Sequence, residues 1–205
     1  MTDRFRGEGI HKVDGKGRVS IPVLFRRVLE SGDPDWTEGL NPNAVIVYGG
    51  ITQKYLEVYT QKAINEVDSK ISHLPRGSKE RRALEHIFNG QALPTQPDES
   101  GRLVIPLRLR EKVGITNEAH FSATGDTFQI WSPESSYEQA KSIENWLTEQ
   151  GNDFDPLVLL SSGSNKDIKE NRPENSSDKF CESLITLGSL SIPKTLDPTF
   201  LEEYE

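Results

Sequence analysis

The chain has 205 residues, a formal net charge of −8 and 27% charged residues. With a mean hydropathy of −0.60, this composition is typical of a water-soluble protein that has a modest core. No apolar run approaches the length of a membrane span, the charged amino-terminal segment lacks the apolar stretch of a secretory signal, and the single cysteine, Cys181, cannot form an intrachain disulfide. We therefore expect a cytoplasmic protein with no membrane partner.

The negative charge is concentrated towards the carboxyl end of the chain. Residues 1–150 contain 19 Lys and Arg against 21 Asp and Glu, whereas residues 151–205 contain 5 against 11. The first thirty residues carry a net positive charge. Because DNA affinity depends on where positive charge lies more than on its sum, the overall acidity does not exclude a nucleic-acid partner.

The first predicted elements are a turn, a short strand and a helix within VDGKGRVSIPVLFRRVL (13–29). Asp14 can bond the backbone two residues on and Gly17 tolerates a positive φ, so D-x-x-G predicts a tight turn. The alternation in RVSI (18–21) predicts a half-buried strand. Pro22 suits the first position of the helix that follows.

A strand pair and two helices come next. AVIVY (44–48) and KYLEVY (54–59) predict two strands joined by the turn GGITQ. Apolar residues at helical spacing after Thr60 predict an amphipathic helix, and KERRALEHIFNG (79–90) predicts another. The Pro-bounded segment LPTQP (93–97) predicts a link to the second half of the chain.

The second half of the chain repeats the first at a constant offset. PDESGRLVIP (97–106) repeats VDGKGRVSIP (13–22), and the shared pattern is D-x-x-G-R-φ-x-I-P-x-x-x-R, in which φ is apolar. The identical pairs are Asp14/Asp98, Gly17/Gly101, Arg18/Arg102, Ile21/Ile105, Pro22/Pro106 and Arg26/Arg110. The second copy is completed by a helix over 107–113 that ends at Gly114, strands at 120–124 and 127–131, and a helix after Ser132-Pro133.

One copy alone has short strands and little core, so it could not be stable by itself. Two copies packed about a pseudo-two-fold axis would close a small barrel and remove most sheet edges. The expected fold is therefore α+β, mainly a β barrel with flanking helices. Arg18 and Arg102 would lie on equivalent exposed turns of this barrel.

These residues resemble the MraZ family, a tandem branch of the AbrB-like swapped-hairpin superfamily. The resemblance covers roughly residues 4–147 and is carried by FRG (5–7), VDGKGRVSIP, ERR (80–82), DESGRLVIP and TFQIW. It implies two tandem AbrB-like half-barrels. The first repeat would cover 5–53 and, with its trailing helices, 54–90; the second repeat and its trailing helix would cover 91–150.

The resemblance also implies a function. MraZ-like proteins are sequence-specific transcription regulators that bind short G-rich direct repeats upstream of the division and cell-wall gene cluster. The implied regulator represses that cluster, including its own gene. It would be associated with the nucleoid and would form a ring of subunits that presents successive arginine turns to successive repeats of double-stranded DNA.

The family motif makes Arg18 the principal candidate for DNA binding, with Lys16 beside it and Arg102 as its match in the second copy. That second turn is less basic, because Ser100 takes the place of Lys16 and follows Glu99. An arginine can bond guanine O6 and N7 bidentately in the major groove, which suits a G-rich site. Phosphate contacts are the expected role of further basic residues, namely Lys12, Lys16, Arg4 and Arg6.

Structural roles are the alternative for several of these residues. Arg18 and Arg102 could instead pair with the aspartates of their own turns. Four residues are expected to serve the turn structure itself: Asp14, Gly17, Asp98 and Gly101. Solvated-face or salt-bridge roles are expected for Arg26 and Arg110 on the short helices. The densest basic run should be a solvated helix face or a subunit contact, and consists of Arg76, Lys79, Arg81 and Arg82.

The sequence offers no enzyme site. The glycines follow Asp14 and Asp98 by three residues, whereas the paired carboxylates of aspartic proteases need D-[ST]-G. Neither a phosphate-binding loop nor a dinucleotide motif occurs. The four histidines lack metal-ligand spacing, so we expect no metal, cofactor or small-molecule ligand; they are His11, His73, His86 and His120.

The main rival interpretation is an AbrB-like antitoxin or protein-interaction module whose tail binds a partner protein. Residues 151–205 are expected to be an acidic, largely disordered tail that includes a short apolar segment at 184–201. Within that segment GSLSIPKTL echoes GRVSIPVLF, a match so short that chance explains it. The sharper hypothesis is a degenerate strand that docks onto a barrel as an added strand.

Overall fold

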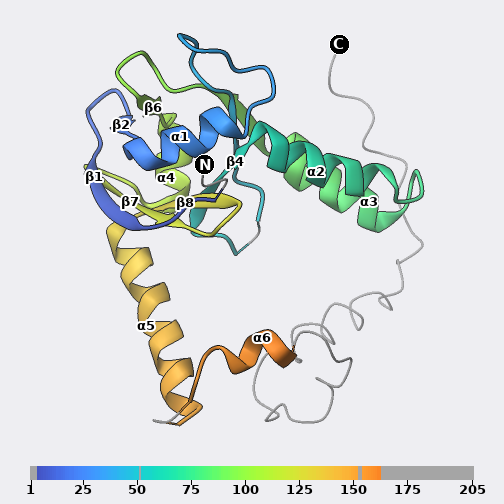
Figure 1. The fold of residues 1–205 in the computed structure, drawn as a ribbon, viewed down its shortest axis with the longest axis vertical. Coiled ribbons are helices and arrows are strands. Elements are labelled where there is room, and N and C mark those ends of the chain that lie inside the picture. The colour runs from blue at the N-terminus through green and yellow to red at the C-terminus, as the bar shows by residue number, and fades with distance from the viewer. Residues whose placement is uncertain (1–3, 51, 152–153, 163–205) are drawn as a thin grey trace, which may run out of the picture. The chain divides into compact units, whose positions relative to one another are not determined.

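The computed structural model describes residues 4–50, 52–151 and 154–162, and the tail segment at 184–201 lies outside them. The chain divides into two units, Met1–Gly151 and Asn152–Glu205. The first unit contains the two sequence copies (Figure 1). The described part of the second unit contains one helix, α6 (Val158–Ser162). No helix among the described residues has the length and apolarity that a membrane crossing requires.

The two copies share an order of strands and helices, and the first has additional helical elements at its end. The first copy consists of β1 (Glu8–Lys12), β2 (Arg18–Ser20), α1 (Val23–Ser31), β3 (Ala44–Val47), β4 (Tyr55–Thr60), α2 (Gln61–Ser72), α3 (Lys79–Glu85) and the π-helical turn η1 (His86–Gly90). The second consists of β5 (Ala92–Thr95), β6 (Arg102–Val104), α4 (Leu107–Val113), β7 (Glu118–Ala123), β8 (Thr127–Trp131) and α5 (Pro133–Glu149).

The strands exchange partners between the copies. One sheet has six strands in the order β1-β7-β8-β4-β3-β5, and a separate two-stranded ribbon pairs β2 with β6. In the six-stranded sheet the first strand of each copy pairs with the hairpin of the other, β1 with β7 and β5 with β3. Exchanging the two copies gives the same strand order read from the other edge. The architecture is therefore α+β, with two swapped-hairpin halves related by a pseudo-two-fold axis.

The pseudo-two-fold axis passes through the β2–β6 ribbon. Val19 is paired with Leu103, its equivalent in the sequence repeat. The backbone hydrogen bonds on either side are also equivalent: Ile21 N donates to Gly101 O at 3.0 Å, and Ile105 N donates to Gly17 O at 2.8 Å. Each turn is thus tied to the other copy by its own glycine.

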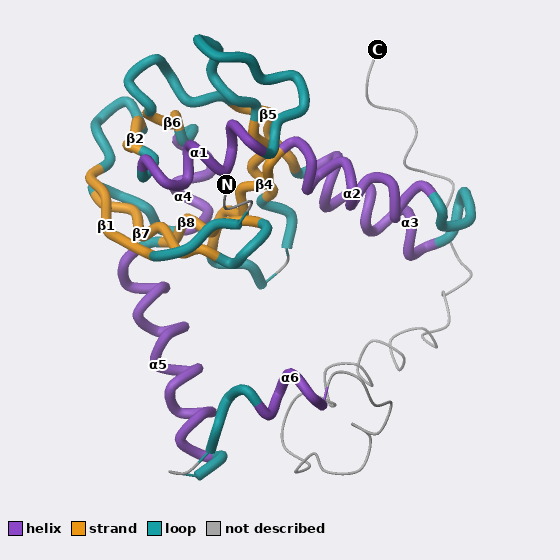
Figure 2. The backbone as a smooth tube through the Cα atoms, in the orientation of Figure 1, coloured by secondary structure: helices purple, strands orange, loops and turns teal. Residues whose placement is uncertain are grey.

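The helices begin where the sequence predicted, and α4 also ends at the predicted residue. Pro22 and Pro106 precede α1 and α4, and Gly114 ends α4 in the left-handed conformation with a φ of 72°. Thr60 and Ser132 accept hydrogen bonds from backbone N–H groups in the first turns of α2 and α5. Figure 2 shows α2 and α3 side by side, leading away from the strands, and α5 leaving the sheet after β8.

The core lies between the two copies. Phe5 is 2% exposed and packs edge-on against Phe25 of α1 and Phe128 of β8, with ring centroids 5.4 and 5.0 Å apart. Phe121 of β7 stacks on Phe128 at 5.7 Å. Residues from both copies fill this one cluster. The burial of apolar surface therefore holds the two halves together, in addition to the exchanged strands.

Two local expectations were wrong. The segment 93–97, expected to be a link, lies mostly in the edge strand β5. The helix expected over 79–90 changes at His86 into the π-helical turn η1. Within the expected α+β fold, the strands are divided between the ribbon and the six-stranded sheet, and do not form one continuous ring.

Candidate nucleic-acid interface

The first turn is organised by Asp14. Its Oδ1 atom accepts hydrogen bonds from the backbone N–H groups of Lys16 and Arg18, both at 2.9 Å. Its Oδ2 atom accepts from Arg18 Nε at 2.6 Å. The backbone hydrogen bond from Arg18, first among several, holds the pKa of this carboxyl below its usual value. Arg18 is therefore oriented through Nε, while its terminal nitrogens make no hydrogen bond to the described residues.

The second turn repeats this geometry with one difference. Asp98 Oδ1 accepts from the backbone N–H groups of Ser100 and Arg102, both at 2.9 Å. Asp98 Oδ2, however, lies near two guanidinium nitrogens of Arg102, 3.0 Å from Nε and 2.9 Å from Nη2. Hydrogen bonds, first that from the backbone of Arg102, lower the pKa of Asp98 as well. Each arginine therefore donates one side-chain hydrogen bond, through Nε, to the aspartate of its own turn.

The two arginines project from the same face of the β2–β6 ribbon. Val19 and Leu103, at the alternate positions, are 1% and 0% exposed and point into the core. Arg18 lies opposite Val104 in the ribbon, and Arg102 lies opposite Ser20. Since strand side chains alternate between faces, these four residues share the outer face of the ribbon.

The sequence suggested that Arg26 and Arg110 lie on solvated helix faces or in salt bridges. Among the described residues the structure shows neither role. Both are half-buried, and each guanidinium covers the glycine of the opposite copy: Arg26 covers Gly101, and Arg110 covers Gly17. Arg110 Nε also donates to the carbonyl oxygen of Ile105 at 3.1 Å. Arg26 Nε is buried without a hydrogen-bond partner among the described residues. Each short helix therefore supports the other copy's turn.

The remaining basic candidates are not all at the ribbon. Lys16 is exposed on the first turn, and Lys12 is exposed at the end of β1, two residues before Asp14. Arg4 lies instead beside the β7–β8 turn, 3.5 Å from Asp126, at the opposite end of β1. Arg6 is exposed next to that same end. The structure thus brings Lys12, Lys16 and Arg18 together and separates Arg4 and Arg6 from them.

Comparisons with known proteins match this chain over most of its length. A protein named transcriptional regulator MraZ from Ruegeria pomeroyi is 57% identical over 162 residues, which are 78% of this chain and 96% of the relative. The MraZ chain of Ruegeria sp. (strain TM1040) is 59% identical over the same shares. A Cereibacter sphaeroides MraZ is 41% identical over 167 residues, covering 78% of this chain and 97% of the relative. The chain belongs to the MraZ family.

The family model, described as "MraZ protein, putative antitoxin-like", matches residues 88–151, which is the second copy. The internal repeat therefore extends the MraZ pattern to the first copy, where the more basic turn lies. The relatives are covered almost completely by 78% of this chain, so the chain has residues that those MraZ proteins do not match.

In this MraZ-family chain the basic run on the helical hairpin serves partly to shape the hairpin. Arg81 Nε donates to Glu85 Oε1 at 2.7 Å, and Arg81 Nη1 donates to the carbonyl oxygens of Ser72 and Leu74. Arg82 donates to the carbonyl oxygen of Gly77. These two arginines close the connection between α2 and α3.

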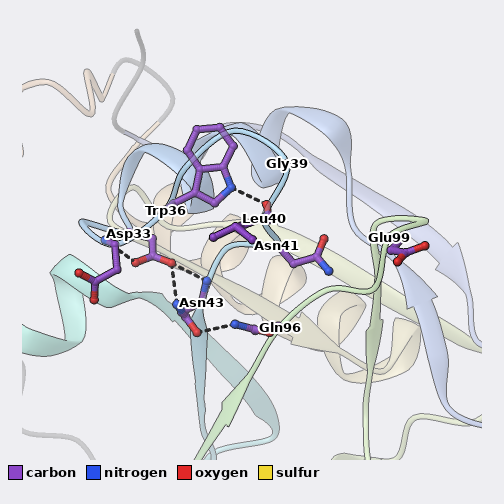
Figure 3. Close-up of a pocket in the computed structure, with 9 residues that line it drawn as sticks. Asp33, Trp36, Gly39, Leu40, Asn41, Asn43, Gln96 and Glu99 are labelled. Atoms are coloured by element: carbon purple, nitrogen blue, oxygen red, sulfur yellow. Dashed lines mark hydrogen bonds between the residues drawn. The ribbon is translucent and has the colours of Figure 1, made fainter.

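A polar cavity of about 280 Å³ lies between the loop that precedes β3 and the second turn (Figure 3). Asp33 is buried at its wall and accepts hydrogen bonds from the backbone and side chain of Asn43, whose Oδ1 accepts from Gln96. Glu99 lines the opposite side. The hydrogen bond between Asn43 and Gln96 links this loop to the segment that leads into the second turn.

Among the described residues, no cluster of histidine, cysteine or carboxylate side chains suits a metal ion.

Sequence reasoning overlooked that Ser20 and Val104 share the ribbon face of the two arginines. Their alternation with buried Val19 and Leu103 is visible in the sequence and places them on the arginine face. What the sequence does not show is that β2 pairs with β6, which brings each of them opposite an arginine of the other copy.

Proposed function

We propose that this chain is a DNA-binding transcriptional regulator and not an enzyme. The observation that carries the proposal is the pair of aspartate-held arginines on one outer ribbon face, in a chain whose MraZ relatives are named transcriptional regulators. An arginine fixed through Nε offers its terminal nitrogens to guanine or phosphate with little loss of side-chain entropy on binding.

The first turn is the stronger contact in this proposal. Arg18 has Lys16 on the same turn, whereas Ser100 takes that position beside Arg102 and follows the acidic Glu99. Arg18 bonds a guanine edge in the major groove, and Lys16 and Lys12 contact phosphates. Arg102 adds a second contact. Arg4 and Arg6 add to the positive electrostatic potential of the protein or contact phosphates at a distance from the ribbon.

The finer functional assignments follow the family resemblance. The protein binds G-rich direct repeats of a promoter as a ring-shaped homo-oligomer, and it represses the division and cell-wall gene cluster that includes its own gene, within the nucleoid. Several weak contacts made around a ring combine into a high overall affinity, which suits a chain of net negative charge. Analytical ultracentrifugation of the full chain measures whether such an oligomer exists.

The decisive experiment is a gel-shift titration of the wild type and Arg18→Ala against the DNA upstream of the chain's own gene, at several salt concentrations. Specific, salt-sensitive binding by the wild type and its loss in a variant with an unchanged melting curve would support the proposal. Arg102→Ala should lose less affinity. Absence of specific wild-type binding at low salt would reject it.

The description of the family model as antitoxin-like favours one second candidate. In that alternative, the chain binds a toxin through residues 151–205 and DNA through the ribbon. A toxin gene adjacent to this one, and a stable complex of the two products on size-exclusion chromatography, would support it. Deleting residues 152–205 should abolish that complex and leave DNA binding intact.

A further inference from the structure

The outer face of the β2–β6 ribbon is symmetric in its arginines and asymmetric in their neighbours. Arg18 and Arg102 are equivalent in the sequence repeat, and Ser20 and Val104 are the next equivalent pair on the same face. Cross-strand pairing places Val104 opposite Arg18 and Ser20 opposite Arg102. Each arginine therefore has a different cross-strand neighbour, methyl groups in one case and a hydroxyl in the other.

In this position Val104 contributes little to the stability of the fold. The residue is 47% exposed, while Val19 and Leu103, on the inner face of the ribbon, are buried in the core. Neighbouring strand residues on one face have Cβ atoms about 4.5–5.5 Å apart, so Val104 lies within reach of whatever Arg18 contacts. An exposed apolar side chain beside a guanidinium that is held through Nε and keeps its terminal nitrogens for a ligand is suited to a surface that has both hydrogen-bond acceptors and methyl groups.

The major groove of DNA offers this combination. It admits a two-stranded ribbon, guanine presents O6 and N7 acceptors to arginine, and thymine presents its C5 methyl group to apolar side chains. A serine hydroxyl can donate or accept and therefore discriminates less among the bases. Uracil differs from thymine only in lacking the methyl group, which provides a direct probe of such a contact.

We infer that Val104 and Ser20 are specificity-determining residues of the DNA site. Val104 contacts the methyl group of a thymine next to the base bound by Arg18, and Ser20 leaves the equivalent position beside Arg102 unselective. This inference rests on the proposed function and adds that the protein binds its DNA site in one orientation. Two identical ribbon strands would favour a palindromic site, whereas the Ser20/Val104 difference, with Lys16 against Ser100, gives the bound sequence a polarity.

The first step of the test obtains the probe. Full-length wild-type protein selects duplexes from a randomised library, and the preferred duplex is then resynthesised with each thymine replaced singly by deoxyuridine. Binding of every duplex is measured by fluorescence anisotropy at fixed salt. Replacing one particular thymine at each ribbon-binding position should lower the affinity of the wild type about fourfold. This is the effect of removing about one buried methyl group.

The variants then assign that loss. Val104→Ser should bind the thymine and uracil duplexes equally, Val104→Thr should keep part of the difference because one methyl group remains, and Ser20→Val should create a second sensitive thymine. The double variant S20V/V104S should move the sensitive thymine to the Arg102 side of the site. Ile10→Ser, at a 57% exposed apolar position on β1 outside the ribbon, is the matched control and should keep the wild-type pattern.

The outcomes separate this inference from the proposed function. If the wild type selects a sequence but no thymine is sensitive to loss of its methyl group, or if Val104→Ser keeps the sensitivity, the inference is overturned and DNA binding stands. If the wild type selects no sequence, both are overturned. Since Ser20 and Val104 are exposed, the variants should melt like the wild type, and melting curves verify this.

Discussion

Asp14 binds the guanidinium of Arg18 through a single hydrogen bond, in which Arg18 Nε donates to Asp14 Oδ2 at 2.6 Å. The other carboxylate oxygen, Oδ1, accepts from the backbone N–H groups of Lys16 and Arg18 in the turn. Removing this carboxylate frees both the turn and the guanidinium, so the ordering that the native turn provides must be supplied on binding. We expect Asp14→Ala to weaken DNA binding about tenfold. Asp98→Ala, the equivalent change, should weaken it less, because Arg102 makes the lesser contact. Equal losses, measured by anisotropy, would contradict the unequal roles of the turns.

Gly17 has a φ of 79°, and a Cβ atom at this position would collide with the carbonyl oxygen of Ile105. We expect Gly17→Ala to lower the free energy of unfolding by about 1–3 kcal/mol, because a left-handed conformation and a backbone clash are combined. At Gly101, whose φ is 70°, the atoms nearest to a Cβ atom would belong to the movable Arg26 side chain, so Gly101→Ala should cost less. Gly15→Ala has open space and should be neutral in urea titrations. A neutral Gly17→Ala would contradict this account.

Asp33 should make the free energy of unfolding depend on pH in the acidic range. Burial acts to raise the pKa of this carboxyl, but hydrogen bonds from Asn43 and Asp35 outweigh burial and lower the pKa below 3.8. A lowered native pKa means that the carboxylate stabilises the fold fully above the unfolded value of 3.8, and that this contribution is lost as the pH falls through the native pKa.

The comparison with Asp33→Asn isolates this effect. The difference in unfolding free energy between the wild type and Asp33→Asn should stay constant from about pH 7 to about pH 5 and shrink below the unfolded pKa. Urea titrations across this range measure it. Asp35→Asn, at an exposed position of the same loop, keeps the backbone N–H that donates to Asp33 Oδ1 and is the control for the substitution itself. A constant difference down to the lowest pH would show that Asp33 is not the responsible group.

Arg26 and Arg110 form a matched pair for stability. Arg26→Met keeps the packing of the stem and removes a half-buried charge that has no partner among the described residues, so the free energy of unfolding should stay level or rise by about 1 kcal/mol. Arg110→Met removes the hydrogen bond to Ile105 O and should lower it by about 1 kcal/mol. A loss for Arg110→Met without a loss for Arg26→Met is the expected result in urea titrations, and a loss for both would contradict it.

Local structure was largely predictable from the sequence. Pro22, Thr60 and Ser132 marked helix starts, and the two hairpins followed from runs of alternating or apolar residues. These features depend on side chains within a few residues of each other. The repeat of 13–22 at 97–106 also predicted the two-fold relation, because similar sequences fold alike.

The exchange between copies was not predictable in detail. β1 has no buried residue, and β5 contains Pro94, so neither showed the pattern of a strand; both become strands by pairing with distant hairpins. The crossing of Arg26 onto Gly101 has the same origin, since helical spacing alone suggested a solvated face. Which residues share the outer ribbon face likewise depends on the pairing of β2 with β6.

The exchanged strands also determine when the molecule can be completed as it leaves the ribosome. Glu8 at the start of β1 pairs with Ser122 near the end of β7, so the amino-terminal strand stays without its sheet partner until nearly the whole double unit has been synthesised. Contacts so distant in sequence make folding slow and leave strand edges open for longer. A nascent chain that stalls after the first copy therefore presents a half-built sheet, and the hairpin of a neighbouring nascent chain is the surface best shaped to complete it.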